Sequence, residues 1–173
     1  MANHKLIVPI IEKWEGGWSD DPNDKGGATM KGITLRTYTE YCKRKGLAAP
    51  TKADLKNISQ AQWNEVLKTM FWDKWRADQL ENQSIANILV DWYWNSGAYG
   101  IKIPQRLLGL KEDGIVGPLT INAVNLLPAN ELFNDIKAER LKFVESIVRN
   151  NPSQAKYLNG WKNRINDFKF QRT

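Results

Sequence analysis

Two carboxylates near the N-terminus, Glu15 and Asp24, have the residue types and the spacing that acid catalysis requires. Glu15 ends an apolar, helix-like pattern and has Trp14 beside it, whereas Asp24 lies nine residues later in a polar loop. Apolar surroundings favour a protonated carboxyl group, and polar surroundings keep a carboxylate ionised. Two carboxyl groups that differ in this way are typical of enzymes that cleave glycosidic bonds. Ordinary helix-end and turn residues would show the same spacing, so a structural role for both residues stays open.

The segment from Trp14 to Thr34 is rich in glycine and in turn-forming polar residues. Five glycines and one proline fall within it, so we expect several tight turns between two helices. A calcium loop beginning at Asp21 is not predicted, because Lys25 and Gly32 occupy its fifth and twelfth positions, which need oxygen ligands. The only histidine, His4, lies near the terminus. The sequence therefore predicts no metal site and no cofactor.

A longer motif surrounds Glu15. It consists of Glu-Gly-Gly-Trp at positions 15–18, Asp-Pro-Asn-Asp-Lys-Gly-Gly-Ala-Thr at 21–29 and Gly-Ile-Thr at 32–34. This motif resembles the signature of the family 108 glycoside hydrolases, lysozyme-like N-acetylmuramidases of phages, prophages and bacterial secretion loci. The resemblance implies that Glu15 is the catalytic acid, with Asp24 as a second catalytic candidate. It further suggests substrate contacts for Trp18 and for Thr29, which follows the acid across a turn as in phage-type lysozymes.

Two later motifs extend the resemblance. A helical pattern ends in Trp94, Asn95 and Ser96 followed by Gly97, similar to an aromatic-rich Asn-Ser-Gly motif of the family. We interpret these three residues as a wall of the substrate site, although helix termination alone would explain the amide, the hydroxyl and the glycine. Residues 113–120 are similar to the Asp-Gly-x-x-Gly-Pro-x-Thr motif of small peptidoglycan-binding helical domains. Its members are turn formers, so they specify either shape or binding.

Helical periodicity dominates the chain and predicts a mainly α fold with at most a small β-hairpin between residues 19 and 33. The family resemblance implies that this fold is lysozyme-like. Residues 1–99 would form the catalytic region, and residues 100–173 a helical subdomain packed on it. We expect the first helix to begin near Val8, and a capping box at Ser59 and Gln62 to open another. The apolar stripe predicted as core in that later helix comprises Trp63, Val66, Leu67, Met70 and Phe71.

The composition is that of an ordinary globular protein with a basic surface. The 173 residues are 42% hydrophobic and 25% charged, with a net charge of +6. A basic protein attracts polyanions, either nucleic acid or the acidic polymers of the bacterial wall. The basic residues are dispersed and form no nucleic-acid motif, so we expect no nucleic acid as a partner. The family resemblance implies peptidoglycan as the partner. We further expect no membrane association and a monomer.

The single cysteine, Cys42, excludes an internal disulfide, which fits synthesis in the cytoplasm. The N-terminal apolar run is short and broken by Pro9, so it predicts no signal peptide. Action on the cell wall would then require a holin-type lesion or a dedicated secretion route.

Together with the two carboxylates, the resemblance implies a bacteriolytic peptidoglycan hydrolase of the endolysin type. It would cleave the β-1,4 bond between N-acetylmuramic acid and N-acetylglucosamine, with Glu15 as general acid. A separation of about 5–5.5 Å between the Glu15 and Asp24 carboxyl groups would favour retention, and about 6.5–9.5 Å inversion. Two alternatives stay open: a lytic transglycosylase, which needs only one acid, and a non-catalytic wall-binding protein.

Overall fold

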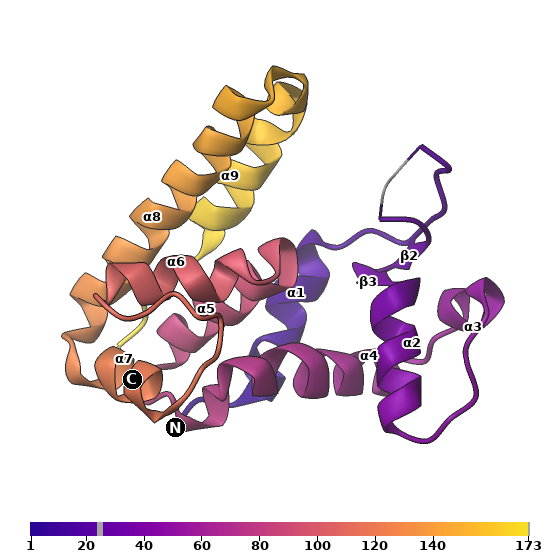
Figure 1. Cartoon of the computed structure of the whole chain (residues 1–173), viewed down its shortest axis with the longest axis horizontal. Helices are drawn as coiled ribbons and strands as arrows, with labels where there is room; N and C mark the ends of the chain where they lie inside the picture. Colours follow the sequence, from indigo (N-terminus) through magenta and orange to yellow (C-terminus); the bar gives the residue numbers. More distant parts are fainter. Residues whose placement is uncertain (24–25, 173) are drawn as a thin grey trace. The chain divides into compact units, whose positions relative to one another are not determined.

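The computed structural model describes residues 1–23 and 26–172 (Figure 1). Contacts divide the chain into two units, the first formed by His4–Asp73 and the second by Met1–Asn3 with Lys74–Thr173. The predicted mainly helical fold is confirmed. The predicted domain boundary between residues 99 and 100 rests on sequence motifs, whereas the two units are defined by contacts. The domain boundary therefore stays a prediction.

The first unit consists of short helices and one small sheet. Its elements in chain order are the 3-10 turn η1 (His4–Leu6), α1 (Val8–Trp14), β1 (Trp18–Ser19), β2 (Thr29–Met30), β3 (Ile33–Thr34), α2 (Leu35–Arg44), α3 (Lys52–Lys56), α4 (Gln60–Leu67) and the π-helical turn η2 (Lys68–Trp72). Helix α1 begins at Val8 as predicted, with Pro9 in its first turn, where the missing N–H costs nothing. The capping box of Ser59 and Gln62 is also present at the start of α4.

The sheet is antiparallel, in the order β1-β2-β3, and so has one strand more than the predicted hairpin. Trp18 lies opposite Met30, and Met30 lies opposite Ile33. The two residues that join β2 to β3, Lys31 and Gly32, both have positive φ, 47° and 84°. Positive φ at both central residues characterises the type I′ turn, whose twist matches that of paired strands.

The core predicted for the helix that begins after Ser59 differs from the structure in one part. Trp63, Val66 and Leu67 are buried, but Met70 and Phe71 are only partly buried. The reason is that the helix widens into the π-helical turn η2 directly after Leu67, which shifts the phase of the following side chains. Trp72 is completely buried as a result.

The second unit is formed mainly by longer helices. Its elements are η3 (Asp73–Trp75), which spans the boundary, η4 (Ala77–Gln79), α5 (Gln83–Ser96), α6 (Tyr99–Leu107), α7 (Pro118–Leu126), α8 (Ala129–Asn150), η5 (Pro152–Tyr157) and α9 (Leu158–Asp167). Helix α5 packs against α6 and α8, and α8 and α9 lie side by side (Figure 1). The buried side chains of α5 include Ile85, Ile88, Leu89 and Trp92, as its apolar spacing predicts.

Helix α6 begins at Tyr99 and continues through Pro104. Proline lacks the N–H that would bond to the carbonyl group four residues earlier, which belongs to Gly100. The indole N–H of Trp75 donates to that carbonyl oxygen at 3.2 Å. This side-chain donor replaces the lost backbone bond, so the helix accommodates the proline.

Candidate active site

Glu15 occupies the position directly after the last residue of α1. Its backbone is extended, with φ −93° and ψ 140°, and its N–H donates to the carbonyl oxygen of Glu12 at 3.2 Å. The side chain is half-buried. Gly16 and Gly17 follow, and a Cβ atom placed on either would meet no atom of the described residues within 4 Å. An acidic side chain therefore lies beside a stretch of open backbone.

Two predicted substrate-contacting residues lie on neighbouring strands that follow Glu15. Trp18 begins β1 and Thr29 begins β2, and both side chains are half-buried. The pairing of Ser19 with Thr29 holds the two strands in register. The Lys56 ammonium group lies 5.7 Å from the centre of the Trp18 ring, within range of a cation–π contact. Asp24, the second predicted catalytic residue, lies outside the described residues.

A polar network connects α1 to the β2–β3 turn. The amide nitrogen of Gln60 donates to Glu12 and, at 2.8 Å, to Asn64, while its amide oxygen accepts from the Lys31 ammonium group at 3.4 Å. The indole N–H of Trp63 donates to the Lys31 carbonyl oxygen at 3.1 Å. Helix α4 thus binds both the final turn of α1 and the turn between β2 and β3. In the chain, Glu15 and Trp18 lie between these two parts.

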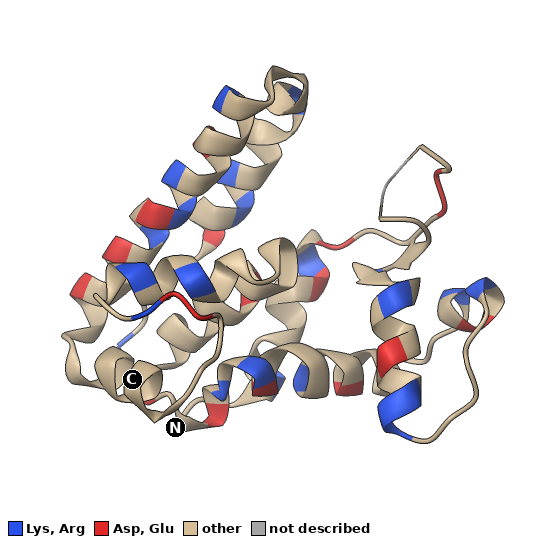
Figure 2. Cartoon of the chain, in the orientation of Figure 1, with Lys and Arg blue, Asp and Glu red and all other residues tan. Residues whose placement is uncertain are grey.

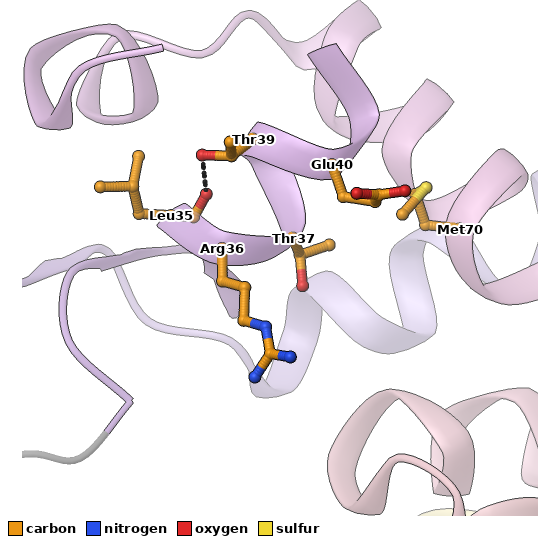
Figure 3. Close-up of a pocket in the computed structure, with 6 residues that line it drawn as sticks. All are labelled: Leu35, Arg36, Thr37, Thr39, Glu40 and Met70. Carbon is orange, nitrogen blue, oxygen red and sulfur yellow. Dashed lines mark hydrogen bonds between the residues drawn. The ribbon is translucent and has the colours of Figure 1, made fainter. Parts of the chain in front are cut away.

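A pocket of about 620 Å³ lies along α2 in the same unit (Figure 3). Its lining residues are Leu35, Arg36, Thr37, Thr39, Glu40 and Met70. Figure 3 shows the Arg36 side chain extending away from the first turn of α2, where β3 ends. Among the described residues, none of those predicted for catalysis or sugar contact lines this pocket, so it is a separate feature.

The second unit contains the other predicted group, Trp94, Asn95 and Ser96, in the last turn of α5. Asn95 is exposed, whereas Trp94 and Ser96 are half-buried. The amide orientation that satisfies its hydrogen bonds directs Oδ1 of Asn95 toward Nε of Arg164 and Nη2 of Arg140, at 3.2 and 3.0 Å. Asn95 is therefore fixed by two side chains from other helices.

Asp91, one turn earlier on α5, holds these two arginines in place. Its Oδ2 accepts from Nη2 of Arg140 at 2.7 Å, and its Oδ1 accepts from Nη2 of Arg164 at 2.6 Å. All three side chains are buried. Burial by itself would raise the pKa of Asp91, but the two guanidinium groups and their hydrogen bonds outweigh it and lower that pKa. The carboxylate is consequently ionised and keeps both arginines oriented.

The buried network of Asp91, Arg140 and Arg164 was missed at the sequence level, although the apolar stripes contain a signal. Asp91 precedes the buried Trp92 on α5, and Arg140 lies midway between the buried Ile136 and Val144, four residues from each. Charged residues are almost never fully buried unless they are paired. Opposite charges within two core stripes of adjacent helices would therefore have indicated a buried ion pair.

Two further features bear on cofactors and membranes. Within residues 1–23 and 26–172, no three His, Cys, Asp or Glu side chains gather closely enough to hold a metal ion. Among the helices of these same residues, none combines the length and apolar character needed to span a lipid bilayer.

Comparison with known proteins assigns the chain. Residues 8–97, more than half of the chain, match the family model described as glycosyl hydrolase 108. The chain belongs to this family. It is therefore a glycoside hydrolase, and residues 99–166 match a second model, described as a predicted peptidoglycan domain, which indicates peptidoglycan as its polymer. No curated protein matches the chain.

A solved structure described as that of Brucella abortus SagA is similar to this family 108 hydrolase in fold. The two chains share 25% sequence identity, and their superposition has a TM-score of 0.74. The similarity covers 95% of this chain and 94% of that one. The likeness therefore extends over both units, including the segment that follows the glycosyl hydrolase match.

Proposed function

We propose that the protein is an N-acetylmuramidase, which hydrolyses the β-1,4 bond between N-acetylmuramic acid and N-acetylglucosamine with Glu15 as general acid. The observation that carries the proposal is the position of Glu15, a half-buried acid at the end of α1 beside two glycines with free space around them. A general acid needs partial shielding from water together with access for the glycosidic oxygen. The match of residues 8–97 to the glycosyl hydrolase model supports it further.

In this mechanism Glu15 donates its proton to the glycosidic oxygen of the leaving sugar. Positive charge then develops on the other sugar ring, in an oxocarbenium-like transition state. Asp24 stabilises that charge or positions the attacking water, a role proposed from the sequence alone. Trp18 offers an aromatic surface to a sugar ring, and Thr29 offers a hydroxyl group from the neighbouring strand.

Glu15→Gln tests the acid directly. The substitution keeps the shape of the side chain and removes the acidic proton, so lysis of purified peptidoglycan should fall by about 10²–10⁴-fold. The matched control is Glu12→Gln, one turn earlier on α1, because a glutamine there can still accept the hydrogen bond from Gln60. Its activity should stay near the wild-type value. Wild-type lysis by Glu15→Gln would refute the assignment.

Mass spectrometry of the soluble fragments decides the reaction type. A muramidase releases fragments with a reducing muramic acid end, because water is the nucleophile. A lytic transglycosylase, the second candidate, releases anhydro-muramic fragments, because a hydroxyl group of the substrate attacks instead. Anhydro products would also leave Asp24 without a role in positioning water, and Asp24→Asn would then retain activity.

The proposal includes the parts of the organisation that the sequence predicts. Residues 1–99 would catalyse the reaction, and residues 100–173 would hold the wall polymer. The protein would act as a monomer that reaches the wall through a holin-type lesion or a dedicated secretion route, in the manner of a bacteriolytic phage or prophage endolysin. A protein that sediments with the wall but releases no fragments would instead favour a non-catalytic wall-binding function.

A further inference from the structure

We propose that a groove between α8 and the α5–α6 corner binds an acidic muropeptide unit, its sugar on Tyr99 and its peptide carboxylates at Arg149 and Lys142. The inference deepens the proposed function and depends on it for the substrate class. It assigns a binding site within the second unit to named residues.

The groove consists of two adjoining pockets along α8. The first has a volume of about 470 Å³ and is lined by Asn95, Ser96, Tyr99, Phe143, Ser146, Ile147 and Asn150. The second, of about 230 Å³, is lined by Ile103, Arg106, Glu139, Lys142, Phe143, Ser146 and Arg149. Phe143 and Ser146 line both pockets, so the two form one continuous surface.

The first pocket has the chemistry of a sugar site. The Tyr99 side chain is 60% exposed, and its ring centre lies 5.4 Å from that of Phe143. Phe143 therefore supports an aromatic ring that still presents much of its surface to solvent, where the C–H face of a sugar ring would bury apolar area. Asn95, Ser96 and Asn150 supply amide and hydroxyl groups around it.

Asn95 is oriented for one kind of partner. Its Oδ1 accepts from Arg140 and Arg164, so the other end of the amide, Nδ2, is a donor on a residue that lines the groove. An amide N–H donates only to acceptors. The carbonyl oxygen of an acetamido group, which both peptidoglycan sugars carry, is such an acceptor. Arg140 and Arg164 act here as positioning residues, because they fix which end of the Asn95 amide faces outward.

The second pocket is basic. Arg106, Lys142 and Arg149 line it with one carboxylate, Glu139, a difference of two positive charges. Lys142 is 72% exposed and lies 3.6 Å from Glu139, a surface pair of little energetic weight. Within the described residues Arg149 has no carboxylate partner. Figure 2 shows basic positions along α6 and α8. This charge complements an acidic ligand.

A muropeptide carries a sugar part and an acidic part next to each other, as the two adjoining pockets require. It joins N-acetylated sugars to a short peptide that carries free carboxylates, so one ligand would occupy the sugar-like pocket and the basic pocket together. A neutral glycan would leave Arg149 without an ionic partner within the described residues, and a free anion would leave Tyr99 without a contact. The observations therefore favour the complete muropeptide over either part.

The test measures binding of two soluble probes to full-length Glu15→Gln protein, which should not cleave them. One probe is a disaccharide-peptide muropeptide. The other is a neutral disaccharide of N-acetylglucosamine, which keeps the acetamido groups and carries no carboxylate. Tyr99→Ala should weaken both by about tenfold, the usual effect of losing an aromatic contact at the centre of a site. Arg149→Ala should weaken only the muropeptide, by about threefold and less at high salt. Lys74→Ala, an exposed cation of the same unit outside the groove, is the control.

The outcomes separate this inference from the proposed function. Tyr99→Phe keeps the ring and should bind like the parent protein, and an unchanged thermal unfolding curve of Tyr99→Ala excludes misfolding as the cause of its loss. If Tyr99→Ala and Arg149→Ala both bind the probes as tightly as the parent protein, the groove is not the muropeptide site. This holds even if wild-type protein still releases reducing muramic acid fragments. Equal loss of both probes in Arg149→Ala would overturn the peptide assignment. Absence of lysis by the wild-type protein would instead refute the proposed function, whatever the binding results.

Discussion

Trp63 on α4 donates its indole N–H to the carbonyl oxygen of Lys31, 32 positions earlier in the chain, at 3.1 Å. Lys31 has positive φ, which is uncommon for a residue with a side chain. The hydrogen bond therefore fixes a strained turn of the sheet against a buried aromatic side chain. Because β1 pairs with β2 directly before this turn, the bond also fixes the strand that begins at Trp18.

Trp63→Phe should destabilise the protein by about 1–3 kcal/mol, because it leaves the Lys31 carbonyl group without this donor and removes ring volume. Trp92→Phe is the matched control. Trp92 is also fully buried, but its indole nitrogen has no hydrogen-bond partner among the described residues. Thermal unfolding of both variants measures the difference. Equal losses of stability would mean that the Trp63 hydrogen bond contributes nothing beyond packing.

Gly100→Ala should destabilise the second unit by about 3 kcal/mol or more. A Cβ atom at this position would lie 2.5 Å from the backbone nitrogen of Tyr93 and 2.6 Å from the carbonyl carbon of Trp92. These are backbone atoms of α5, so no side-chain rotation relieves the contact and the two helices must separate. Gly160→Ala in α9 meets nothing within 4 Å and should be neutral or slightly stabilising. Similar melting temperatures for the two variants would contradict this account of α5–α6 packing.

Much of the fold could be predicted because it depends on local chemistry. The cap at Ser59 with Gln62 and the proline at the start of α7 act within one helical turn, so the sequence reveals them. The π-helical turn at Lys68–Trp72 could not be predicted in this way. Its residues continue an ordinary apolar pattern, and packing decides which of them is buried.

The candidate site was predictable to a lesser extent. The placement of Glu15 at a helix end follows from the apolar pattern that stops at Trp14. The hydrogen bonds that orient the Asn95 side chain could not be predicted in this way, because Arg140 and Arg164 lie 45 and 69 positions later in the chain. Only the packing of α5, α8 and α9 brings these side chains together. Charges within the apolar stripes indicate buried ion pairs, but they do not indicate that Asn95 joins them.

Asp91→Asn should cost about 3–5 kcal/mol at neutral pH, because it leaves two buried guanidinium groups without their carboxylate. The contribution of Asp91 also depends on pH. Its pKa is lowered in the folded protein, and an unfolded aspartate titrates near pH ~3.9. The stabilisation is therefore complete above about pH 4 and is lost as the pH falls through the lowered folded pKa.

Urea unfolding at a series of pH values measures this dependence. The difference in stability between wild type and Asp91→Asn should narrow as the pH falls below about 4. Asp135→Asn, at an exposed position of α8, provides the control and should follow the wild type throughout. A difference between wild type and Asp91→Asn that stays constant down to pH ~2 would show that the carboxylate charge contributes no pH dependence.

Gly16 and Gly17 lead to the last prediction, because the fold does not require glycine at either position. Neither has a positive φ, and an added Cβ atom would meet nothing within 4 Å in the part of the chain that the structure describes. Gly17→Ala should therefore change the free energy of unfolding by less than about 0.5 kcal/mol. If this backbone lies against the substrate beside Glu15, the new methyl group occupies space that the sugar needs. We then expect kcat/KM to fall by about 10- to 100-fold, the cost of displacing a substrate by about an ångström. Gly160→Ala should change neither quantity. Full activity in Gly17→Ala would place the substrate elsewhere and would remove the main structural support for Glu15 as the acid.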